Sequence, residues 1–298
     1  MADIIPLKFL KTTGGAVVAP SELNPGDTIP SAYIGGLIGS NMLINCGVPV
    51  INQRGFAGGA LAAGVYGYDR WKAGTGGCNV TINTTTGVFT HTSGPLVQVV
   101  ESPEAAWGVP VTLSVESPSG AISVNIGGTT GSITAGTGRR SVTLTPTGSG
   151  HMTVQLTAAG VTYSAPRLER GSVATAPEYR PAGVELMLCQ RYYEKSYDLA
   201  VFPGTASAFG RCGEFLGITP RNTANSLLQR FMVQKRVTPA VTVYASETGA
   251  VGNISQENGS NAAINSISAS GHTGFQVTYT NGSGRYGASF HYVADAEL

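Results

Sequence analysis

The residues best suited to ligand chemistry in this sequence are aromatic. Tyr66, Tyr68 and Trp71 lie close together, with Asp69 and Arg70 between them. Aromatic faces beside polar groups are a common way to hold a sugar, because one face of a sugar ring is apolar and its rim needs hydrogen bonds. The group therefore indicates a glycan-binding surface, with Asp69 and Arg70 as its polar part. The alternative, which we favour for Trp71, is that its indole fills a hydrophobic core.

The other tryptophan, Trp107, lies in a predicted loop and offers a second aromatic surface. We therefore predict Tyr66, Tyr68 and Trp107 as glycan-binding residues. A second group of aromatic residues lies near the end of the sequence. Strand alternation there places Phe290 and Tyr292 on one face, packed beneath a sheet, and His291 on the other, facing solvent or another subunit.

Groups for acid–base, nucleophilic or metal chemistry are scattered. The 17 acidic residues show no paired pattern, and no HExxH motif, nucleophile elbow or P-loop occurs in the sequence. The four cysteines lack the spacing of a zinc site, and we expect buried free thiols. They are Cys46, Cys78, Cys189 and Cys212. The pattern predicts a protein that is not an enzyme and that uses no cofactor and no metal ion.

Composition restricts the partners. Charged residues make up 12% of the chain, against roughly 25% in average soluble proteins, and the formal net charge is +1. This balance gives no electrostatic basis for binding nucleic acid. No stretch is apolar and long enough to suggest membrane insertion, and the N-terminus does not resemble a signal peptide.

The elements that would position these residues are mostly strands. Short β-rich runs recur about every ten residues between turn-forming residues, which is typical of a β-sandwich. The first set is Asn79–Asn83, Leu96–Glu101, Val109–Glu116, Ala121–Ile126, Ser141–Thr145, Met152–Thr157 and Val161–Arg167. The second set is Leu227–Val237, Ala240–Ala245, Ala262–Ala269, Gly274–Thr280 and Tyr286–Val293. We predict an all-β protein with a larger sandwich followed by a smaller one.

One strong helix signal separates the two sets of strands. We predict a helix over residues 182–197, opening after Pro181. Its apolar residues mark two faces rather than one stripe, and such a helix needs two covering surfaces. We infer that one of these is a neighbouring subunit, with three copies meeting about an axis. The predicted trimer-interface residues are Leu186, Leu188, Tyr192 and Tyr193.

Residues 1–40 are rich in proline and glycine and have little hydrophobic periodicity. Such a segment does not build a core of its own. We predict an extended arm that docks on another protein, or alternatively on its own domain. The apolar residues available for docking are Ile4, Ile5, Leu7 and Phe9.

Several of these segments resemble a known family. Asn41–Asn45, Asn52–Gly55 and Tyr68–Trp71 resemble the opening of jelly rolls, similar to carbohydrate-binding modules, that occur in phage tail and fibre proteins. Residues Pro166–Thr175 and Glu178–Pro181 resemble the closing strand and exit of that module. Glu185–Lys195 and Phe290–Leu298 are similar to the C-terminal domain that often follows it.

The resemblance implies a homotrimeric virion fibre protein that attaches to the host surface, usually through a glycan. The implied organisation is a virion-anchoring arm over 1–40, a jelly roll over 41–177 and a C-terminal β-sandwich over 178–298. Some related jelly rolls bind calcium, but no ligand set transfers to this sequence. Two alternatives stay open: a purely architectural head or collar fibre, and a polysaccharide depolymerase, which would need two carboxylates about 5 to 9.5 Å apart.

Overall fold

A computed structural model describes residues 7–11, 17–22, 41–177, 179–215, 224–280 and 287–298. Residue contacts divide the chain into two units, Met1–Gly39 and Ser40–Leu298. In the first unit, β1 (Leu7–Lys11) pairs antiparallel with β2 (Val17–Glu22), so the predicted arm contains a strand pair. Of the predicted anchoring residues, Leu7 and Phe9 lie in β1, whereas Ile4 and Ile5 lie outside the described residues.

The first part of the second unit is a sandwich of two antiparallel sheets, which confirms the predicted fold class. Neighbouring strands of one sheet are β10 (Thr129–Ile133), β9 (Ile122–Ile126), β12 (Met152–Thr157), β7 (Pro95–Val100) and β4 (Lys72–Ala73). The other sheet contains β11 (Arg139–Leu144), β8 (Val111–Glu116), β13 (Val161–Arg170), β6 (Val88–Ser93), β5 (Cys78–Ile82) and β3 (Gly59–Leu61). From β7 to β13 the chain passes repeatedly between the sheets, as jelly rolls do.

The sandwich core lies between the two sheets. Alternating burial along β9 and β12 shows why these residues form strands, since one side chain in two points inward. Trp71 is fully buried, and its indole meets Phe89 edge-on with 5.6 Å between ring centroids. The expectation that Trp71 fills the core is confirmed.

The predicted helix is shorter than expected. Helix α2 spans Ala182–Gln190 and is followed by strand β14 (Tyr193–Lys195). The prediction of a helix to residue 197 is therefore wrong, because β14 pairs with β21 (Gly287–Asp295) and this pairing outweighs local helix propensity. No helix in the described part of the chain is long and apolar enough to cross a membrane.

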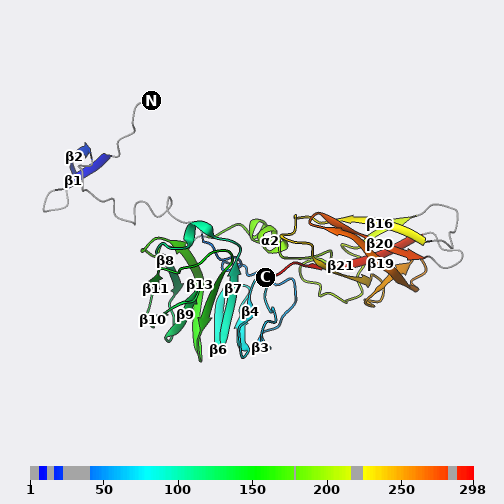
Figure 1. Ribbon diagram of the computed structural model, residues 1–298, viewed down its shortest axis with the longest axis horizontal. Coiled ribbons are helices and arrows are strands. Elements are labelled where there is room, and N and C mark those ends of the chain that lie inside the picture. Colours follow the sequence, from blue (N-terminus) through cyan, green and yellow to red (C-terminus); the bar gives the residue numbers. More distant parts are fainter. Residues whose placement is uncertain (1–6, 12–16, 23–40, 178, 216–223, 281–286) are drawn as a thin grey trace. The chain divides into compact units, whose positions relative to one another are not determined.

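The strands after α2 form one sheet that curls around its own core. In order, its strands are β14, β21, β18 (Asn253–Gln256), β19 (Asn261–Gly271), β20 (Gly274–Thr280) and β16 (Ala224–Arg230). Strands β15 (Cys212–Phe215) and β17 (Ala240–Ala245) also pair with β21. Figure 1 labels β16, β19, β20 and β21 of this sheet. Register shifts along β19 let this long strand bend. One curled sheet therefore stands where the sequence predicts the smaller sandwich.

The core of the curled sheet confirms the predicted face of its last strand. Phe290 and Tyr292 are buried in it, together with Phe275 of β20. His291 points to the opposite face but is fully buried there, because the Tyr197 ring of the same chain stacks on it at 3.8 Å. The expectation that His291 faces solvent or another subunit is wrong.

Candidate functional site

Of the residues predicted to bind glycan, Tyr68 lies inside the molecule. Its side chain is 2% exposed, and its ring meets Phe56 edge-on at 5.3 Å. The Tyr68 hydroxyl accepts a hydrogen bond from the Ile82 N–H at 3.0 Å. A ring enclosed in this way has no surface on which a sugar could stack, so we no longer assign Tyr68 to a binding site.

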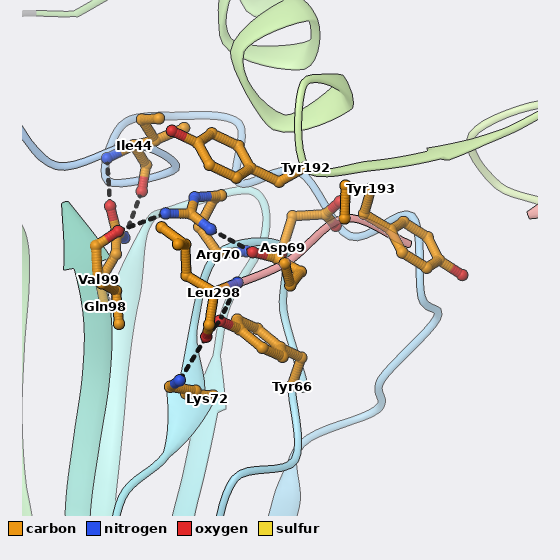
Figure 2. Close-up of polar contacts among 12 residues, drawn as sticks. Ile44, Tyr66, Asp69, Arg70, Lys72, Gln98, Val99, Tyr192, Tyr193 and Leu298 are labelled. Carbon is orange, nitrogen blue, oxygen red and sulfur yellow. Dashed lines mark hydrogen bonds and ion pairs between the residues drawn. The ribbon is translucent and has the colours of Figure 1, made fainter. Parts of the chain in front are cut away.

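Tyr66 is half-buried and binds the C-terminal segment of the chain. Its hydroxyl donates to the main-chain oxygen of Leu298 at 2.5 Å and accepts from the Leu298 N–H at 3.2 Å. The Lys72 ammonium donates to the same oxygen (Figure 2). Burial raises the pKa of Tyr66 to about 12. The polar end of Tyr66 is therefore engaged within the protein.

Two arginines fix the same segment from the sandwich side. Arg70 is 1% exposed, forms an ion pair with Glu297 and donates to the Val99 carbonyl oxygen at 2.5 Å. Its guanidinium carbon lies 3.5 Å from the centroid of the Tyr192 ring. Arg54 pairs with Asp295 at 3.1 Å. These contacts connect the sandwich to the end of β21.

Asp69 completes this arrangement from a fully buried position. Its carboxylate accepts hydrogen bonds from the Gln53 N–H at 2.6 Å and from Gln53 Nε2 at 2.7 Å, and Gln53 Nε2 also donates to the Tyr193 carbonyl. Burial raises the pKa of Asp69 to about 6, although the bonds from Gln53 oppose the shift. We call this whole group the C-terminal junction. It comprises Gln53, Arg54, Tyr66, Asp69, Arg70, Lys72, Tyr192, Tyr193, Asp295, Glu297 and Leu298.

Two of the predicted trimer-interface residues belong to this junction. Tyr192 and Tyr193 are 4% and 5% exposed, covered by Arg70 and Arg54 of their own chain. They cannot meet a neighbouring subunit in this conformation. Leu186 and Leu188, in contrast, are half-buried on α2. The inward face of that helix carries Glu185 and Cys189.

Trp107 is the predicted residue that keeps exposed surface without binding the C-terminal segment. It follows the short helix η1 (Glu104–Ala106), is half-buried, and donates from Nε1 to the Gly150 carbonyl at 3.0 Å. Its six-membered ring lies over Gly127 and Gly148. A Cβ on Gly127 would come within 2.5 Å of the ring. The two glycines thus create the space that holds the indole in place.

Polar residues lie near this indole in the fold, because Gly150, which accepts its hydrogen bond, directly precedes His151. His151 Nδ1 is 3.2 Å from both the main-chain nitrogen and the hydroxyl of Ser102, and both residues are exposed. Ser102 adopts a φ of 38°, a conformation uncommon for residues other than glycine. Glu104, also exposed, starts η1. We call Ser102, Glu104, Trp107 and His151 the Trp107 surface. It combines an immobilised aromatic ring with hydrogen-bonding groups.

No metal centre is evident in the part of the chain that the structure describes, where no three His, Cys, Asp or Glu side chains converge. The expected free thiols are present: Cys46, Cys78 and Cys189 are buried, and Cys212 is half-buried. Burial raises the pKa of each of these thiols, which leaves them protonated and poor nucleophiles.

Comparison with known proteins reveals distant structural similarities. No protein-family model and no curated protein sequence matches the chain. Discoidin II from Dictyostelium discoideum aligns over 74% of this chain and 88% of its own, with 11% identity and a TM-score of 0.24. A Paenibacillus sp. cycloisomaltooligosaccharide glucanotransferase, solved with cycloisomaltoheptaose, aligns over 81% of this chain and 46% of its own, with 11% identity and a TM-score of 0.23. Similarities of this size do not assign the chain to a family.

Proposed function

We propose that this chain is a non-enzymatic fibre protein of a phage virion, located in the tail or baseplate, that attaches to the host surface by binding a glycan. The observation that carries the glycan-binding part is the Trp107 surface. An aromatic ring held rigidly beside hydroxyl, carboxylate and imidazole groups matches the apolar face and polar rim of a sugar. The virion assignment rests on the sequence resemblance alone.

The test of glycan binding compares three forms of the full-length chain on an array of immobilised bacterial surface oligosaccharides. Wild type should bind at least one saccharide, Trp107→Ala should lose binding to at least one saccharide that wild type binds, and Tyr179→Ala should retain it. Tyr179 is 62% exposed and therefore serves as a control for removing a surface aromatic ring. Equal binding by wild type and Trp107→Ala would contradict the role of Trp107. Release of shortened saccharides during incubation would contradict the non-enzymatic assignment.

The proposed assembly is a homotrimer in which part of α2 contacts neighbouring copies. Leu186 and Leu188 stay candidates for this interface, and Val184 and Met187 of the same helix are 39% and 52% exposed. The N-terminal residues Ile4, Ile5, Leu7 and Phe9 are the proposed contacts to another virion protein. Light scattering of the full chain should give three times the monomer mass of 30.6 kDa. A monomer at micromolar concentration would contradict the trimer.

A second candidate is a purely architectural fibre without a receptor. It is favoured by one observation: Tyr66, Tyr68 and Trp71 all serve contacts inside the protein, so most of the predicted aromatic surface is unavailable to a sugar. Under this candidate the purified chain neither binds saccharides nor competes with phage for host cells. Competition for adsorption by the soluble chain would exclude it.

A further inference from the structure

A second polar surface lies on the curled sheet, on the outer face of β21. Side chains alternate along this strand, so Ser289 and His291 share that outer face while Phe290 points into the core. His291 is covered: Tyr197 stacks on it, and its ring nitrogens are within 2.9 Å of Ser196 Oγ and the Ser207 carbonyl oxygen. Ser289, in contrast, is half-buried, and its hydroxyl lies 2.7 Å from Ser246 Oγ.

At Ser289 the uncovered face is hollow. An open pocket of about 770 Å³ lies there, within the roughly 300 to 1,000 Å³ that is usual for small-molecule sites. Its base is made of small residues because Ser289 pairs with Gly213 of β15 on one side and with Ser255 of β18 on the other. A Cβ on Gly213 would come within 2.8 Å of the Ala288 carbonyl oxygen. Because β15 approaches β21 so closely at this point, position 213 has no room for a Cβ, and no side chain enters the pocket there.

The walls of the pocket supply hydrogen-bonding groups of both kinds. Arg211 and Glu247 face each other at 2.8 Å, and their side chains are 43% and 44% exposed. Glu257 and Asn258 add a carboxylate and an amide. Glu257 also accepts from the Gly287 N–H at 3.1 Å, which fixes its loop against β21. Donors and acceptors thus lie around a shallow floor made of glycine and serine.

This lining selects against several classes of ligand. Among the described residues that line the pocket, none has an apolar side chain larger than that of Ala288, so a lipid or other apolar ligand would gain little. Among the described lining residues the one cation, Arg211, is already paired with Glu247, so the pocket offers a polyanion little positive charge. A neutral ligand rich in hydroxyl groups fits the lining best.

We propose that this pocket, which we call the Ser289 pocket, is a saccharide-binding site separate from the Trp107 surface, and that its ligand is a neutral oligosaccharide. Arg211 and Glu247, which lie side by side, bind sugar hydroxyls as donor and acceptor. The Ser289 pocket is a different site from the Trp107 surface, so variants at the two places test the two proposals separately.

The experiment titrates a neutral oligosaccharide, selected as the strongest neutral hit of wild type on the array, into the full-length chain and its variants. Arg211→Ala and Glu247→Gln should each weaken binding about tenfold or more, since each loses charge-assisted hydrogen bonds. Arg230→Ala is the matched control, because Arg230 is an exposed arginine on β16 whose guanidinium reaches only Thr273 Oγ1, at 3.4 Å, in the described part of the chain. Melting temperatures confirm that the variants are folded.

Backbone amide shifts in the same titration locate the ligand. We expect the amides of Gly213 and Ser289 to shift in wild type and Trp107→Ala, and not in Arg211→Ala. Unchanged affinity in both pocket variants, or shifts confined to the Trp107 surface, would overturn the Ser289 pocket while leaving the proposed function intact. If wild type binds no neutral saccharide on the array, the pocket proposal is wrong; binding to charged glycans only would leave the proposed function standing.

Discussion

The C-terminal junction and the Ser289 pocket use the same kinds of residue in opposite ways. Both contain arginine–glutamate pairs beside the strand β21. In the junction, Arg70 and Glu297 are 1% and 4% exposed and have several partners. In the pocket, Arg211 and Glu247 are nearly half exposed and face solvent. Arg70 and Glu297 of the junction are therefore committed to structure, whereas Arg211 and Glu247 of the pocket are accessible to a ligand.

The largest expected effect comes from breaking the buried pair. Glu297→Gln removes the charge that compensates Arg70, and losing one partner of a buried pair costs about 3 to 5 kcal/mol. Arg54, which also reaches Glu297 at 3.5 Å, loses a partner as well. Urea unfolding should show a decrease of about this size in the free energy of unfolding. A decrease below about 1 kcal/mol would show that the junction contributes little to stability.

The pH dependence of the junction is the next largest effect. Burial raises the pKa of Asp69 from 3.8 to about 6, so the folded state binds the proton more tightly than the unfolded state. As the pH rises from about 4 to about 6, wild type should therefore lose up to about 3 kcal/mol of stability relative to Asp69→Asn. Asp198→Asn is the control, because Asp198 is exposed. If the difference in free energy of unfolding between wild type and Asp69→Asn does not change with pH, the raised pKa of Asp69 is contradicted.

Tyr66→Phe gives a smaller effect that separates structure from binding. It removes the hydroxyl that contacts Leu298 at 2.5 and 3.2 Å, and we expect a loss of about 1 kcal/mol in stability. Saccharide binding on the array should stay unchanged, because the ring belongs to the junction. Weakened binding with unchanged stability would instead restore Tyr66 as a glycan-binding residue.

The smallest expected effect on stability is at the pocket. Glu247→Gln breaks an exposed ion pair, and such pairs contribute roughly 0 to 1 kcal/mol. Its unfolding curve should nearly overlay that of wild type, in contrast to Glu297→Gln. A loss comparable to that of Glu297→Gln would show that the pocket pair is structural and would remove the contrast between the two regions.

The sequence predicts the sandwich well because the strand signal is local. Alternation and turn residues mark segments such as Met152–Thr157, which is strand β12. Alternation and turn residues do not mark the weaker strands. β18 lies between the predicted strands Ala240–Ala245 and Ala262–Ala269, and β10 follows a glycine-rich turn. The helix over 182–197 is predicted too long because nothing near Tyr193 indicates that it pairs with Asp295.

The sites are harder to predict than the strands because their partners are distant in the sequence. Tyr66, Asp69 and Arg70 have the residue types of a sugar site. Only the fold shows that they belong instead to a junction with Glu297, 227 positions from Arg70. The Ser289 pocket leaves no local signal either. Its floor depends on Gly213 and Ser255 meeting Ser289 across three strands, and small residues are common throughout this glycine-rich chain.

A crystal structure of the full-length chain with a neutral oligosaccharide bound tests the contrast most directly. We predict sugar density over Ser289, between Arg211 and Glu257, with the bonds from Tyr66 and Lys72 to Leu298 unchanged. A sugar that displaces Leu298 and occupies the C-terminal junction, with the Ser289 pocket empty, would contradict the account.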